Sequence, residues 1–217
     1  MWPLLAVAPF CGFDWLLNRF NVQNPYYLVH SLHNAVVVYW TLPDIIATFT
    51  DFQNLHAYKV NLDAAALVAA LHLYHIIMYW SKLRFDDWLH HGLMIGVALP
   101  LGCLLPCGTL MGFNLFFTTG LPGGIDYFLL FLVRNNLLHR MTEKKVNKFL
   151  NLWIRSPGCL AHATAATIFV LSNHGPSWMM ALGLLPGLLT YWNGQYFMEQ
   201  VVTDYAIRER DHETHVV

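Results

Sequence analysis

LHLYHIIMYWSKLRFDDWLHHGLM, residues 71–94, carries four histidines and two aspartates on either side of a short basic connection. His72 and His75 lie late in one apolar run, and His90 and His91 open the next. A helix needs about 20 mainly apolar residues to cross the hydrocarbon core of a bilayer. The stretch therefore predicts the end of one membrane helix and the start of the next, with their titratable groups at the same membrane face.

The composition of the whole chain favours an all-α membrane protein. Of its 217 residues, 56% are hydrophobic and only 12% are charged, whereas soluble domains carry about 25% charged residues. The 8 tryptophans suit membrane interfaces, where an apolar ring keeps one polar edge in water. The formal net charge of −1 produces no field that attracts nucleic acid, which is therefore excluded as a partner. Membrane lipids are the expected partners.

Six apolar stretches are long enough to cross a membrane. They cover residues 26–49, 61–80, 87–106, 108–134, 153–173 and 177–206. We therefore predict a polytopic six-helix transmembrane domain over residues 26–208, followed by a polar C-terminal tail over residues 209–217. Residues 1–25 are apolar, but Pro9 and Gly12 argue against a straight spanning helix. An N-terminal interfacial segment is expected there.

The basic residues fall almost entirely on one side of this topology. With six spans, that side holds both termini and the second and fourth connections, and the other side receives Lys59 alone. The eleven basic residues on the side of the termini are Arg19, Lys82, Arg84, Arg134, Arg140, Lys144, Lys145, Lys148, Arg155, Arg208 and Arg210. By the positive-inside rule, both termini should face the cytosol, or the matrix or stroma of an organelle. The expected membrane is the endoplasmic reticulum or an organellar inner membrane.

The fourth span contains the stretch FFTTGLPGGIDYFLL, residues 116–130. Its proline removes a helical hydrogen bond, and its glycines lower helix propensity. One interpretation is a broken helix at a functional site, because freed backbone groups are tolerated in a membrane only beside protein or a wet cavity. The other is a packing kink that allows neighbouring helices to approach closely.

The titratable residues inside the spans gather in the half of the bundle next to the basic face. Ionisable groups in a membrane usually face the bundle interior or a water-filled cavity. We therefore expect a cavity in this inner half. Its expected lining residues are His30, His33, His72, His75, His162 and Glu199, with the histidine pair and Asp126 beside them.

Two aspartates precede the histidine pair at helical spacing. Asp86 and His90 are four residues apart, and so are Asp87 and His91, so each pair shares a helix face. A carboxylate one turn away can fix the tautomer of an imidazole and make it a better base. The candidate catalytic residues are therefore His90, His91, Asp86 and Asp87, with Asp126 from the fourth span.

At HSLHNAVVVYW, residues 30–40, and again at residues 71–94, the sequence resembles the TLC-domain family, which includes the ceramide synthases. The family has a histidine early in its first core helix, matched by His30, and a histidine pair that opens a later helix, matched by His90 and His91. Asp126 stands where the family places an acidic helix. The continuation HHGLMIGVALPLG lacks the threonine and further aspartates of the synthase motif, a departure that bears on catalysis more than on fold.

The resemblance implies a six-helix bundle with a cavity for a long acyl chain. In ceramide synthases the paired histidines and nearby aspartates serve N-acyl transfer from acyl-CoA to a long-chain base. Carried over, His90 or His91 would be the general base or transient acyl carrier, Asp86 and Asp87 would orient them, and Asp126 would polarise the amine or water. A phospholipid or acyl-CoA is the ligand class implied, and no cofactor is firmly implied.

Two other functions stay open, and with them the question of whether the protein is an enzyme. The chain could be a non-catalytic accessory subunit of a respiratory, ATP synthase or photosynthetic membrane complex that keeps the TLC fold. It could also be a metal or haem enzyme, because histidine is a common ligand and His-x-x-His occurs at residues 30–33 and 72–75. The His-x-x-His-His box of membrane di-iron oxygenases does not occur, and the sequence assigns no metal ligands.

Overall fold

The computed structural model describes residues 2–105, 107–172 and 177–216. Every regular element in this described part is helical, which confirms the all-α prediction. The connection predicted between the fifth and sixth spans, residues 173–176, lies outside the described residues, and so does residue 106 of the predicted hairpin.

The elements follow the chain with short connections. They are α1 (Trp2–Arg19), α2 (Pro25–Thr50), the 3-10 helix η1 (Phe52–Ala57), α3 (Leu62–Tyr79), the 3-10 turn η2 (Trp80–Lys82), α4 (Phe85–Leu93), the π turn η3 (Met94–Ala98), α5 (Leu99–Leu104), α6 (Leu110–Leu115), the π turn η4 (Phe116–Gly120), α7 (Leu121–Arg134), α8 (Arg140–Leu150), the π turn η5 (Asn151–Arg155), α9 (Ser156–Ser172) and α10 (Ser177–Val216).

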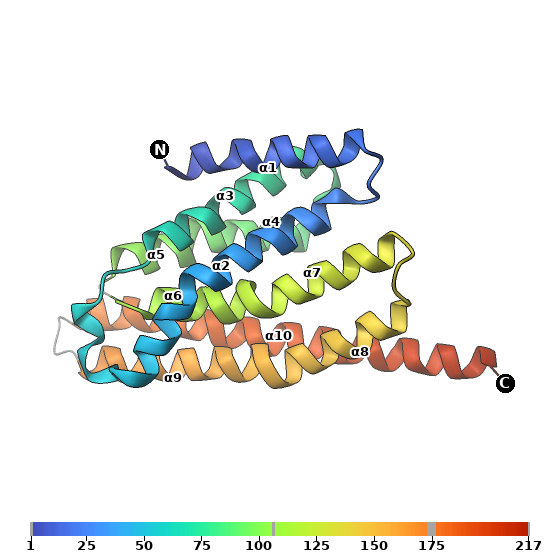
Figure 1. The fold of residues 1–217 in the computed structure, drawn as a ribbon. Coiled ribbons are helices and arrows are strands. Elements are labelled where there is room, and N and C mark those ends of the chain that lie inside the picture. The colour runs from blue at the N-terminus through green and yellow to red at the C-terminus, as the bar shows by residue number, and fades with distance from the viewer. Residues whose placement is uncertain (1, 106, 173–176, 217) are drawn as a thin grey trace.

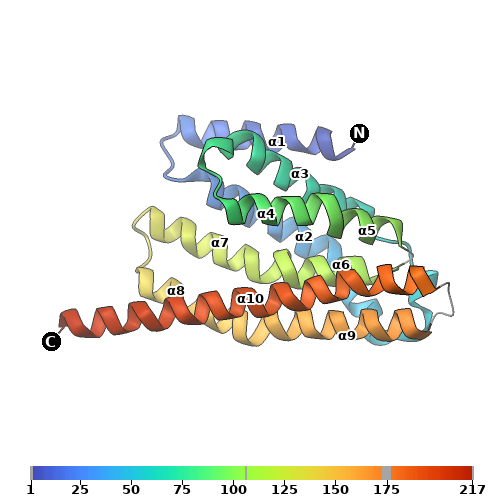
Figure 2. The same ribbon diagram turned by 180° about the vertical axis from the view of Figure 1, so that it is seen from behind.

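Besides α1, which has 18 residues like α3, six helical rods run side by side along the bundle (Figure 1, Figure 2). In chain order they are α2, α3, α4–α5, α6–α7, α8–α9 and α10. Each rod corresponds to one predicted stretch, and most ends differ by one or two residues. The larger differences are that the fifth rod begins at Arg140 rather than at residue 153, and that α10 continues to Val216. The most extensive contacts between helices join α9 to α10, α2 to α7 and α1 to α3.

Within the described residues, two helical segments are long and apolar enough to cross a membrane. They are Leu62–Lys82, with a mean hydropathy of 1.5, and Leu110–Arg134, with a mean hydropathy of 1.4. Large apolar side chains are also exposed on the outside of the other rods, as at Tyr39, Leu104 and Leu188. An exposed apolar surface of this kind marks contact with a membrane or a partner. These features weakly support membrane association.

The N-terminal segment is helical from Trp2 to Arg19, although Pro9 lies inside it. The sequence predicted no straight helix here. Val7, on α1, packs in one core cluster with Leu71 and Tyr74 of α3, and this apolar packing outweighs the hydrogen bond that a proline removes. The interfacial location of the segment stays a prediction.

The fourth rod is not broken at residues 120–124, so the broken-helix interpretation is wrong. The π turn η4 ends at Gly120, and Pro122 sits in the first turn of α7, where its missing N–H is tolerated. Gly123 and Gly124 both face Asn34 of α2. Ser31 donates a hydrogen bond to the Gly124 carbonyl at 3.0 Å. The glycines therefore serve the close approach of α2 and α7.

Gly123→Ala should destabilise the fold. A Cβ atom at this position would lie 2.8 Å from Nδ2 of Asn34, and the Asn34 side chain is fully buried, so neither helix can yield easily. Overpacking of this kind lowers the free energy of unfolding by about 1–3 kcal/mol. Denaturant unfolding of the purified protein in detergent measures the change.

Gly12→Ala is the matched control, because a Cβ atom there would have no neighbour within 4 Å. Alanine in a helix interior should raise the free energy of unfolding by up to about 1 kcal/mol relative to glycine. Equal effects at Gly12 and Gly123 would show that the close approach of α2 and α7 does not require glycine.

Candidate functional site: a histidine cluster at one end of the bundle

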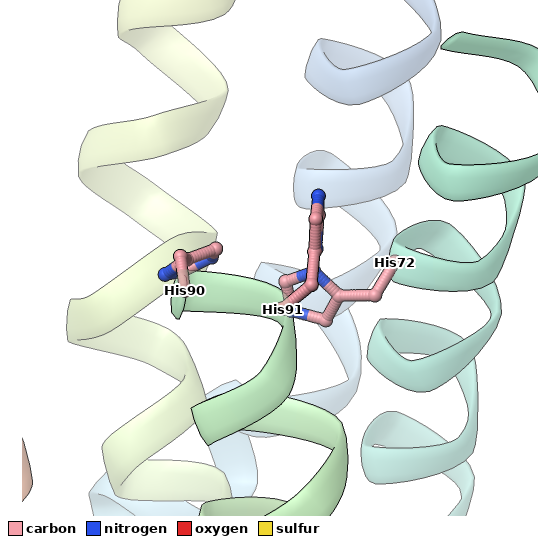
Figure 3. Close-up of side chains that lie close together, drawn as sticks. All are labelled: His72, His90 and His91. Carbon is pink, nitrogen blue, oxygen red and sulfur yellow. The ribbon is translucent and has the colours of Figure 1, made fainter. Parts of the chain in front are cut away.

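Four imidazole rings meet where the end of α3 lies against the start of α4. We call His72, His75, His90 and His91 the histidine cluster. Nδ1 of His72 lies 3.0 Å from Nδ1 of His91, and Nε2 of His91 lies 3.0 Å from Nδ1 of His75. The His90 ring centroid is 5.2 Å from that of His72 and 5.5 Å from that of His91. Figure 3 shows His72, His90 and His91 drawn together from the two helices.

The short connection between α3 and α4 produces this meeting. The turn η2 ends α3, and the next helix begins three residues later at Phe85. The Asp87 carboxylate accepts a hydrogen bond from the Arg84 backbone N–H at 2.9 Å and so caps the start of α4. The Trp80 and Trp88 rings pack edge to face at 4.5 Å across the connection. These contacts hold the first turns of α4 beside the last turns of α3.

His91 is the centre of the histidine cluster. It is 3% exposed, and both of its ring nitrogens lie at hydrogen-bond distance from another imidazole. A neutral imidazole has one donor and one acceptor nitrogen. His91 can therefore donate to His75 while it accepts from His72, or the reverse, so the three rings form a path for a proton.

Of the four histidines, His90 makes the fewest hydrogen bonds through its ring nitrogens. It is half-buried, its contacts with His72 and His91 are between ring faces and edges, and no hydrogen bond engages its ring within the described residues. A substrate group that reaches this end of the bundle would meet His90 with its imidazole lone pair available.

Aromatic side chains from α2, α3 and α7 surround the cluster. Nδ1 of the buried His30 donates to the Tyr26 carbonyl at 2.8 Å, because a carbonyl only accepts. The His30 ring also lies 5.6 Å from His75 and 4.7 Å from Tyr127. The Tyr26 and Tyr127 hydroxyls lie 3.3 Å apart. His30 therefore lies beside the histidine cluster, and its role as a cavity-lining residue stays a prediction.

Asp14 of α1 is a buried carboxylate that the sequence reasoning missed. It is 1% exposed and accepts hydrogen bonds from Tyr74, from Tyr79 at 2.6 Å and from Asn18 at 2.6 Å. Tyr79 in turn packs against the His75 ring at 5.7 Å. The available signal was a single acidic residue within an otherwise apolar segment, which is costly without partners.

The two aspartates before the histidine pair do not act as its hydrogen-bond partners. Asp86 is exposed, and within the described part of the chain no hydrogen bond joins it to His90. Asp87 is engaged as the cap of α4. Its carboxylate nevertheless lies within electrostatic range of His75, His90 and His91.

Of the other predicted lining residues, His33 lies within electrostatic range of His72, whereas His162 and Glu199 lie away from the histidine cluster. His33 is buried between α1 and α3, with its ring 5.6 Å from Phe10 and its Nε2 3.2 Å from the Leu67 carbonyl. His162 packs against Phe113 near the other end of the bundle. Glu199 is exposed on α10.

The depth of His162 differs from the prediction because its rod starts earlier than expected. The helix begins at Arg140 rather than at residue 153. At 1.5 Å per residue, His162 lies roughly 33 Å along the rod from that start. This distance places it beside the beginning of α6 instead of in the inner layer.

Asp126 belongs to a second buried polar group. We call Glu143, Asn147, Asn151 and Arg155 the α8 polar ladder. Its hydrogen bonds run from each side chain back to the one four residues earlier, at 3.4 Å, 2.6 Å and 3.0 Å. The charged groups that act most strongly on Asp126 are Arg155, Glu143 and Lys144. The structure therefore directs Asp126 toward the ladder, whereas the sequence grouped it with the histidine pair.

The ladder pairs a buried anion with a buried cation along one rod. Glu143 is 0% exposed and Arg155 is 8% exposed. Lys144 lies 3.3 Å from Glu143 and 3.0 Å from Asp204 of α10, and the Arg155 guanidinium lies 5.1 Å from the Phe197 ring. The sequence signal is a polar residue at every fourth position, which begins in the predicted connection between the fourth and fifth spans.

Comparison with family models, with curated proteins and with solved structures finds no match.

Arg155→Met should destabilise the protein strongly. It removes a buried cation that lies within electrostatic range of the half-buried Asp126 carboxylate, and leaving such a charge uncompensated costs up to about 3–5 kcal/mol of folding free energy. Adding Asp126→Asn should recover most of that loss, since the orphaned charge is removed as well. Denaturant unfolding of the two single variants and the double variant gives their coupling free energy.

Additive effects of the two substitutions would contradict the assignment of Asp126 to the ladder. Asp51→Asn is the control partner, since Asp51 lies in the connection after α2. It should show no coupling to Arg155→Met.

Proposed function

We propose that this protein is a TLC-like integral membrane protein that holds a long-chain lipid within its six-helix bundle and transfers an acyl group at the histidine cluster. The observation that carries the proposal is the convergence of four imidazoles from α3 and α4 at one end of an apolar bundle. Titratable side chains grouped inside an apolar bundle are a functional site by default.

Length and surface support a six-span arrangement. The 26 residues of α2 extend about 39 Å, more than the roughly 30 Å hydrocarbon core. The other rods run along the bundle with it, and α2 is tilted relative to α9 and α10 (Figure 1). Helix α10, with 40 residues, is long enough to cross the core and continue beyond it. Its basic residues Arg208 and Arg210 then lie on the same side as Arg84 and Lys144, next to the histidine cluster.

The cluster suits proton transfer in acyl exchange. The acceptor amine nitrogen of a long-chain base attacks the carbonyl carbon of an acyl thioester, so a C–N bond forms and the C–S bond breaks. The proton leaves the amine for the free imidazole nitrogen of His90 and returns to the departing thiolate. His91 orients the neighbouring rings through its contacts with His72 and His75. General acid–base catalysis of this kind contributes about 10²–10⁴-fold to a rate.

The test combines lipid identification with an acyl-transfer assay. The protein is purified in mild detergent, its bound lipids are extracted and weighed by mass spectrometry, and acyl transfer is measured with a long-chain acyl-CoA and a long-chain amine. His90→Ala should reduce product formation by about 10²-fold or more and leave the bound lipid in place. His56→Ala is the matched control, because His56 is exposed at the opposite end.

Equal rates of acyl transfer for the wild type and His90→Ala would contradict the proposed role of His90 in proton transfer. Absence of a bound acyl lipid, together with stoichiometric copurifying subunits, would favour the accessory-subunit alternative.

A further inference from the structure

We infer that His72, His90 and His91 form a three-histidine site for a divalent transition-metal ion. One ring nitrogen from each of these side chains lies within 4.8 Å of the other two. They come from two helices and are enclosed by the bundle, with His91 buried and the other two half-buried (Figure 3). The inference does not rest on acyl transfer, because a metal ion would bind there with no lipid present.

One pair of nitrogens in the cluster already has nearly the spacing of a coordination sphere. Zinc–nitrogen bonds of about 2.0–2.1 Å at tetrahedral angles place two ligand nitrogens about 3.3 Å apart. Nδ1 of His72 and Nδ1 of His91 are 3.0 Å apart, so a shift of a few tenths of an ångström opens their contact to that separation. His90, at the adjacent position on α4, has a ring nitrogen within 4.8 Å of the other two, so a turn of its side chain toward them would complete the triangle.

His75 supplies the outer hydrogen bond that such a ligand needs. A metal-binding histidine donates its second ring N–H to a neighbouring acceptor, which fixes the tautomer and the ring orientation. Nε2 of His91 lies 3.0 Å from Nδ1 of His75. Donation along that contact leaves Nδ1 of His91 with a lone pair that points toward His72.

The charge around the cluster also favours a cation. Asp87 places a carboxylate within electrostatic range of His90 and His91, while the side chain of Arg84, its ion-pair partner, is 80% exposed. Three imidazole ligands leave a fourth position open, as in catalytic zinc sites. A metal in this site would bind and polarise a water molecule or a carbonyl oxygen at that position.

Imidazole ligands suit zinc, copper, iron and nickel, and three of them with an open fourth position suit Zn²⁺ in particular. Cobalt(II) can replace zinc in such sites and reports its own geometry through visible absorption. These two ions are therefore the probes.

The experiment uses the full chain, purified in detergent without a polyhistidine tag and stripped with a chelator. Cobalt(II) is titrated into the protein while visible absorption is recorded, and Zn²⁺ is then added as a competitor. The wild type should gain the intense visible bands of a four-coordinate ion, saturate at one ion per chain, and lose the bands when zinc is added.

The variants assign the site. His90→Ala, His72→Ala and His91→Ala should each abolish the bands, and His75→Ala should weaken binding about 10–100-fold. His56→Ala should bind as the wild type does. His90 is the decisive position, because its replacement breaks no hydrogen bond seen among the described residues, so loss of the bands there reflects loss of a ligand. Stripped wild-type protein without four-coordinate bands, or a His90→Ala variant that keeps them, would overturn the inference, whatever the outcome of the acyl-transfer assay.

Discussion

A polar group enclosed by apolar helices must find its partner inside the protein, because no solvent is there to supply one. This constraint explains where the polar residues of the bundle lie. Asp14 takes hydrogen bonds from two tyrosines and an asparagine. The α8 polar ladder joins Glu143 to Arg155 through two asparagines. The histidine cluster differs from both, because its rings are paired with one another instead of with a fixed opposite charge.

That difference is the physical basis for proposing the histidine cluster, and not the other two groups, as the functional site. The Asp14 carboxylate accepts hydrogen bonds from three side chains, and the ladder side chains bond to one another along one rod, which suits a role in positioning helices. Imidazoles paired with imidazoles retain lone pairs and mobile protons, which suits a role in binding or chemistry. Acyl transfer and metal binding draw on the same lone pairs, so the state of the cluster decides between them. Activity that persists after metal removal would assign proton transfer to the free imidazoles, and activity restored by zinc would assign it to the metal-loaded site.

The sequence predicted the helical rods well, because each rod is a long apolar run bounded by polar connections. It predicted less well which neighbouring helix each polar side chain faces. Asp126 and Tyr127 are neighbours in sequence, yet Tyr127 faces His30 and Asp126 faces Arg155. Hydropathy alone did not reveal that α8 extends the fifth rod, and the depth of His162 followed from that omission.

The pairing of His72 and His75 with His91 depends on how α3 and α4 meet, and sequence spacing within one helix does not contain that information. The spacing of Asp86 and Asp87 did predict a shared helix face with the histidine pair. It could not predict that Asp87 caps the helix instead, because capping competes for the same carboxylate. The glycines beside Pro122 were recognised as unusual, but only the position of Asn34 shows that they serve packing.

The central proposal is that the six rods from α2 to α10 cross a membrane, with the histidine cluster toward the end of the bundle where α10 ends (Figure 1). Single cysteines introduced into a cysteine-free variant at Lys59, at Arg140 and at Glu209 can be labelled with a membrane-impermeant maleimide in sealed, oriented vesicles. The account predicts that Arg140 and Glu209 react from one side of the vesicle and Lys59 only from the other. Labelling of all three positions from the same side would contradict it.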